Sequence, residues 1–105
     1  MVKKKKKYFN ERVERYVITA DDDSVWTPCY EGNQIKLFVS LNYFDYYYVK
    51  IAAWGADDYG VERVYHFEQD EKAAREKYAE LLEEMNSIEN GITCMELLSR
   101  GFEPF

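Results

Sequence analysis

The chain has 105 residues, of which 47% are hydrophobic, 17% are aromatic and 32% are charged. This length predicts one domain with one core, and the composition argues against disorder over most of the chain. No stretch approaches the roughly eighteen apolar residues of a membrane span. The two cysteines, Cys29 and Cys94, have no metal or redox spacing, so we expect reduced thiols in a cytoplasmic protein without a cofactor.

The charge is distributed unevenly. Five of the fourteen basic residues stand together at Lys3–Lys7, and we expect residues 1–7 to be a flexible lysine-rich tail before a single α+β domain over 8–105. From Tyr8 onward nine basic residues face twenty acidic ones, a net charge of −11. Such a body repels phosphates and attracts basic surfaces, although solubility alone explains an acidic composition equally well.

The first predicted strand spans Glu11–Ala20. Val17 and Thr19 alternate there with Tyr16 and Ile18, the period of an extended chain. After it, Val25–Thr27 is predicted to form a short strand before a proline.

A hairpin follows, with strands over Gln34–Ser40 and Tyr46–Trp54 and a turn over Leu41–Asp45. Its alternation predicts two faces. The expected core face consists of Ile35, Leu37, Val39, Tyr47, Val49, Ile51 and Ala53. The expected opposite face consists of Phe38, Tyr46, Tyr48, Lys50 and Trp54.

A further strand is predicted over Val61–Phe67, and a long helix after the N-cap Asp70, ending near Asn90 and Gly91. The helix has an apolar stripe of Ala74, Tyr78, Leu81, Leu82, Met85 and Ile88. Thr93 and Glu96 form a capping box that predicts a short second helix over Cys94–Arg100. Phe102 and Phe105 are expected to hold the C-terminus against the domain.

Strands first and helices last, without βαβ alternation, predict an α+β fold. We expect an antiparallel β-meander of four or five strands packed on one long C-terminal α-helix, with a short second helix at the C-terminus.

Catalytic residues are scarce in this sequence. The single histidine, His66, could act with Asp57, Asp58 or Cys29, but a histidine bonded to a backbone carbonyl is the more ordinary interpretation. Neither the acidic turn nor any other stretch has the ligand spacing of a calcium or zinc site. We therefore expect no enzyme and no metal centre.

Two surfaces are candidates for binding a partner. One is the aromatic sheet face with the loop beside it, and the other is the helix face opposite the apolar stripe, where glutamates gather. The candidate partner-binding residues are Tyr46, Tyr48, Trp54, Asp57, Asp58, Tyr59, Glu76, Glu80, Glu83 and Glu84.

The sequence favours a small acidic, non-catalytic protein-binding module that engages a protein with a basic surface. An inhibitor carried by a phage or mobile element, which occupies the nucleic-acid-binding surface of an enzyme such as a CRISPR nuclease, is one version of this hypothesis. A single-stranded nucleic-acid module that stacks bases on the aromatic face and contacts phosphates with the Lys3–Lys7 tail is the first alternative. A small enzyme using His66 is the second, and the aromatic face could equally serve a homodimer.

Overall fold

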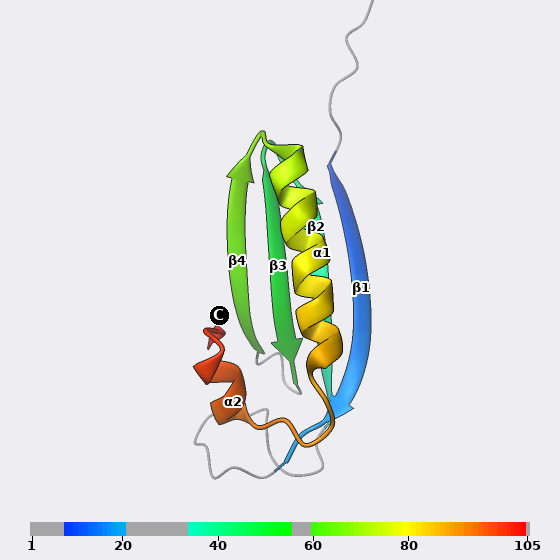
Figure 1. The fold of residues 1–105 in the computed structure, drawn as a ribbon, viewed down its shortest axis with the longest axis vertical. Helices are drawn as coiled ribbons and strands as arrows, with labels where there is room; N and C mark the ends of the chain where they lie inside the picture. Colours follow the sequence, from blue (N-terminus) through cyan, green and yellow to red (C-terminus); the bar gives the residue numbers. More distant parts are fainter. Residues whose placement is uncertain (1–7, 21–33, 56–59, 105) are drawn as a thin grey trace, which may run out of the picture.

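The computed structural model describes residues 8–20, 34–55 and 60–104. The predicted lysine tail, the predicted strand at Val25–Thr27 and Phe105 lie outside the described residues. Figure 1 shows an antiparallel sheet with one long helix lying along it. The elements are β1 (Phe9–Ile18), β2 (Gln34–Tyr43), β3 (Tyr47–Trp54), β4 (Gly60–Glu68), α1 (Glu71–Ser87), α2 (Cys94–Ser99) and β5 (Glu103–Pro104).

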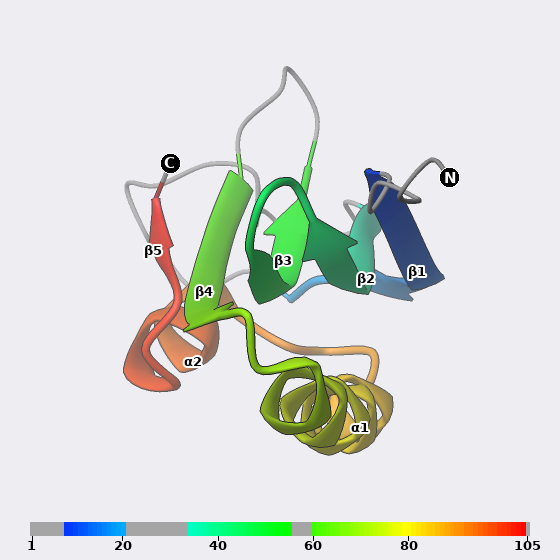
Figure 2. The ribbon, with the colours of Figure 1, turned by 90° about the horizontal axis from the view of Figure 1, so that it is seen from above.

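The sheet has the order β1-β2-β3-β4-β5, with antiparallel pairing throughout. Both helices lie on the same side of it, as Figure 2 shows end-on. This confirms the predicted α+β class and meander. The two-residue strand β5, which pairs with Val61 and Glu62, was not predicted individually.

Alternation along the strands builds the core. Every residue predicted for the core face of the hairpin is buried, with an exposed fraction of 1% or less. Val17 and Thr19 of the β1 segment are buried as well, whereas Tyr16 and Ile18 on the opposite face are exposed. Because side chains alternate between the two faces of a strand, a helix that packs on this sheet can cover only one of its two faces.

The turn predicted over Leu41–Asp45 is wrong in its first half, because β2 continues through Tyr43 and pairs with β3 to its end. Leu41 keeps the parity of the core residues and is fully buried. Asn42, a residue disfavoured in strands, is tolerated because its side chain donates to Ser40 Oγ at 2.9 Å. The turn is completed by Asp45 in the left-handed region, at a φ of 69°.

Helix α1 begins as predicted, with the Asp70 carboxylate accepting a hydrogen bond from the Ala73 backbone N–H at 3.0 Å. Its predicted apolar stripe faces the core. The helix ends at Ser87, earlier than predicted, because Ile88 adopts an extended backbone conformation and is itself buried. No helix in the described residues is both long and apolar enough to cross a membrane.

Helix α2 begins with the predicted capping box between Thr93 and Glu96. It ends at Ser99, and Gly101 follows at a φ of +92°. Phe102 is then buried, as expected, with the Arg63 guanidinium 5.2 Å from its ring centroid.

The end of α1 is held by an arginine from the neighbouring sheet. Arg15 Nη1 donates to the carbonyls of Met85 at 2.9 Å and Ile88 at 2.5 Å. The Met85 carbonyl also accepts from the Ile88 N–H at 3.2 Å, so Arg15 adds a second donor there, and a cation at a helix end also opposes the helix dipole.

We expect Arg15→Met to lower the free energy of unfolding by about 1–2 kcal/mol, since it removes two part-buried hydrogen bonds and a cation at the end of α1. Arg75→Met is the matched control, because Arg75 also joins β1 to α1 but is 45% exposed. Its loss should cost less than about 1 kcal/mol. Urea denaturation measures both values, and equal losses would contradict the capping role of Arg15.

Candidate functional site

Three rings gather where the β2–β3 turn meets β4. Tyr48 and His66 are direct cross-strand neighbours. Tyr46, in the turn, packs its ring against both of them. The Tyr46 ring centroid is 5.6 Å from that of Tyr48 and 5.7 Å from that of His66. Tyr46 and His66 are exposed, so the cluster presents aromatic surface to a ligand.

A second aromatic pair continues this surface toward β1. Tyr8 and Phe44 have ring centroids 4.4 Å apart and are 65% and 53% exposed. A pocket of about 460 Å³ opens beside this pair. It is lined by Tyr8, Asn10, Asn42, Tyr43, Phe44 and Tyr48. We call the five side chains of Tyr8, Phe44, Tyr46, Tyr48 and His66 the aromatic end.

Polar side chains in and next to the pocket lining form hydrogen bonds with one another. Asn10 Nδ2 donates to Asn42 Oδ1, and Asn42 Nδ2 donates to Ser40 Oγ and to the Tyr48 carbonyl. Ser40 and Asn42 are buried. The buried Asn42 amide joins β1, β2 and β3 through these hydrogen bonds, so the rings are presented on a fixed base.

Carboxylates flank the aromatic end. Asp45 lies between Phe44 and Tyr46 in the chain, and Glu68 is the cross-strand partner of Tyr47. Both are exposed, and neither forms a salt bridge within the described residues. Gln69 Nε2 donates to the Asp45 carbonyl at 2.6 Å, which ties the two turns together.

Trp54 does not join this cluster. It lies at the opposite end of β3 and packs edge-on against Phe38, with ring centroids 5.8 Å apart. Phe38 is only 1% exposed, with the Arg12 guanidinium 4.2 Å and Lys50 Nζ 5.7 Å from its ring centroid. The aromatic face expected from the sequence is therefore divided in its middle by cationic side chains.

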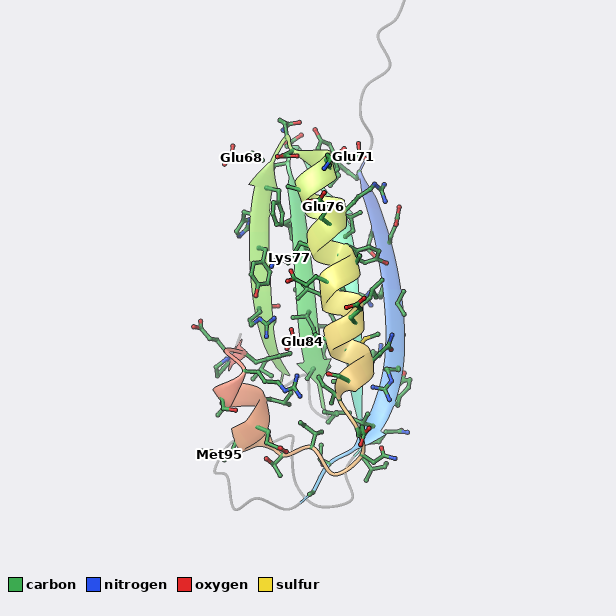
Figure 3. The ribbon with its side chains drawn as sticks, viewed as in Figure 1. Glu68, Glu71, Glu76, Lys77, Glu84 and Met95 are labelled. Atoms are coloured by element: carbon green, nitrogen blue, oxygen red, sulfur yellow. The ribbon has the colours of Figure 1, made fainter. Side chains whose placement is uncertain are left out.

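Most of the helix glutamates have partners within the chain. Glu76 pairs with Lys72 at 2.7 Å, and Glu80 pairs with Lys77 at 2.6 Å. Glu83 is exposed and has no ion pair among the described residues. Figure 3 shows Glu76, Lys77 and Glu84 along the length of α1. The like-charge crowding expected from the sequence is thus relieved inside the chain.

Glu84 connects three elements. Its carboxylate accepts from Arg63 of β4 at 2.7 and 3.0 Å, and lies 3.4 Å from Nη1 of Arg100, just after α2. The Arg63 hydrogen bonds hold the pKa of the Glu84 carboxyl below its ordinary value, against the opposing effect of burial. Glu84 therefore has a structural role, because its ion pairs with Arg63 and Arg100 join α1 to β4 and to the end of α2.

The other candidate residues cannot be placed. Asp57, Asp58 and Tyr59, and the Cys29 considered as a partner for His66, lie outside the described residues. Within the described ranges, the ring contacts of His66 are with Tyr46 and Tyr48. No group of three metal-ligating side chains occurs in that part of the chain.

We expect Glu84→Gln to lower the free energy of unfolding at pH 7 by about 1–2 kcal/mol, since it removes a charge-assisted, bidentate contact. Because folding depresses the pKa of Glu84, its contribution is present above the ordinary glutamate pKa of about 4.3 and is lost as the pH falls through the depressed value. The difference between wild type and variant should therefore shrink in acid.

Chemical denaturation between neutral and acidic pH tests this. Glu80→Gln is the control, because the Glu80 side chain is 65% exposed and bonds one lysine. A Glu84→Gln effect that is no larger than the control, or that persists unchanged in acid, would contradict the structural role of Glu84.

Comparison with protein-family models, with curated proteins and with solved structures finds no match to this chain.

Proposed function

We propose that this protein is a small non-catalytic binding module whose aromatic end engages the basic surface of a partner protein. The observation that carries the proposal is the combination of exposed rings with flanking carboxylates, Asp45 and Glu68, that have no ion pair among the described residues. Tyrosine-rich surfaces give large contact area with little loss of side-chain entropy.

This chemistry suits arginine and lysine side chains. A guanidinium or ammonium group can stack on a tyrosine ring while its charge is neutralised by a neighbouring carboxylate. The chain itself already uses this arrangement at Phe38, over which Arg12 and Lys50 lie. The net charge of −11 from Tyr8 onward would also accelerate encounter with a basic partner.

A nucleic-acid ligand fits less well. Lys36 and Lys50 on the second sheet face lie 3.8 Å and 3.4 Å from glutamates of the same chain, so both already have anionic partners. Asp45 and Glu68 would repel phosphates beside the rings. A nucleic-acid-binding protein is accordingly a better partner than the nucleic acid, and an inhibitor of such an enzyme is one form of this proposal.

The test titrates the ¹⁵N-labelled full chain with an arginine-rich peptide and, separately, with oligothymidylate. We expect the peptide to shift the amide signals of Tyr46, Tyr48 and His66, and its affinity to fall with added salt. Tyr46→Ala should weaken peptide binding about tenfold, because a ring that stacks on a cation contributes on the order of 1 kcal/mol or more.

Tyr16→Ala is the matched control, because Tyr16 is an exposed tyrosine on the same sheet face that is not part of the aromatic end. Its peptide affinity should equal that of wild type. Equal weakening by both substitutions, or tighter binding of the oligonucleotide than of the peptide, would overturn the proposal.

A further inference from the structure

Strand β1 is a ten-residue edge strand. It pairs with β2 on one side, and no strand among the described residues pairs with it on the other side. In Figure 1 it forms one side of the sheet, away from α2 and β5. Two apolar side chains along it, Val13 and Tyr16, are 42% and 54% exposed. A long edge strand is a template for another strand, and proteins usually block such edges with proline, a bulge, a covering loop or charged side chains; the charged side chains of β1 are of both signs.

The backbone hydrogen bonds of Ile18 show which groups of β1 point outward. The Ile18 N–H donates to Asn90 Oδ1 at 2.8 Å, and its carbonyl accepts from the Gly91 N–H at 2.8 Å. Both groups therefore point away from β2. Because this direction alternates along an antiparallel strand, the same orientation holds for every second residue before Ile18. The residues with outward N–H and carbonyl groups are then Asn10, Arg12, Glu14 and Tyr16.

We propose that β1 pairs with β1 of a second copy of this chain, in antiparallel register centred on Val13, to form a homodimer with one continuous sheet. The four outward residues of each copy would exchange about eight backbone hydrogen bonds across the two-fold axis. The two Val13 side chains would meet at the centre. The contact that Asn90 and Gly91 make with Ile18 ends the free stretch beyond Tyr16.

Charge selects this register. Centring the pair on Val13 places Glu11 opposite Arg15 of the second copy, and it places Arg12 opposite Glu14. A shift of the centre by one residue in either direction places two Arg12 or two Glu14 side chains opposite each other. Opposite charges at facing positions stabilise an antiparallel pair and like charges destabilise it. Among these registers, the one centred on Val13 gives complementary charges at every charged position.

The charged side chains are positioned for this role. Arg12 and Glu14 lie on the second sheet face at 38% and 35% exposure, 3.1 Å from each other. Two such pairs across the axis would form a ring of alternating charges. On the helix side, Arg15 contacts α1 carbonyls through Nη1 only among the described residues, so Nη2 and Nε can meet Glu11 of the second copy, whose Oε2 lies 3.4 Å from Arg75 in its own chain.

The other edge of the sheet is a poorer choice. Strand β5 covers Val61 and Glu62 at the start of β4. Farther along β4, Arg63 Nη1 donates to the Arg100 carbonyl at 2.8 Å, so the segment after α2 lies beside this edge. A β1-to-β1 contact also uses the same edge of both copies, so a dimer has no further β1 edge to offer to a third copy. Association should therefore stop at the dimer.

Sedimentation velocity of the full chain tests the proposal with two variants that complement each other. Arg12→Glu places glutamates opposite each other, and Glu14→Arg places arginines opposite each other. Each should weaken self-association about tenfold or more. An equimolar mixture should restore the dimer as a heterodimer, because position 12 of one variant then meets the opposite charge at position 14 of the other.

Lys72→Glu and Glu83→Arg are the matched controls, since they make the same charge changes on α1 and should dimerise like wild type. The mixing step separates loss of pairing from loss of folding. A wild type that stays monomeric at high concentration, a dimer unaffected by both β1 variants, a mixture that stays monomeric, or association beyond the dimer would each overturn the proposal.

Discussion

The structure depends on one constraint, which is that a single long helix must close the core of a sheet with four long strands. Helix α1 lies over β2 and β3, and every second residue of these strands is buried beneath it. One helix cannot also cover both edges and the opposite face. The edge strand β1 and the aromatic end are therefore what this core leaves exposed, and the proposed contacts with other molecules lie there.

The ion pairs of the described residues also distinguish helix α1 from the aromatic end. Of the glutamates that crowd together on α1 in the sequence, Glu76 and Glu80 pair with lysines on the same helix, and Glu84 pairs with arginines from β4 and the α2 end. Asp45 and Glu68, beside the exposed rings, have no such partner among the described residues. For this reason the proposed binding surface is the aromatic end and not the glutamate face of α1.

Most of the fold could be predicted because it follows from local periodicity. Alternation placed the core residues of β2 and β3 on one face, and the capping residues Asp70 and Thr93 marked both helix starts. What could not be predicted depends on distant residues. Asn42 continues a strand with side-chain bonds to Asn10 and the Tyr48 carbonyl, Trp54 packs against Phe38 of β2 and not against the other rings, and Glu84 is paired because α1 packs beside Arg63. No local pattern contains these contacts.

Amide hydrogen exchange along β1 tests most directly whether its outer edge is open and pairs with a second copy. The alternation predicts that the amides of Val13 and Arg15, which face β2, exchange slowly at every protein concentration. The amides of Arg12 and Glu14 should exchange rapidly in dilute solution and slowly as the concentration rises, because only a second strand protects them. Exchange at Arg12 and Glu14 that is slow in dilute solution, or that stays rapid at high concentration, would contradict this account.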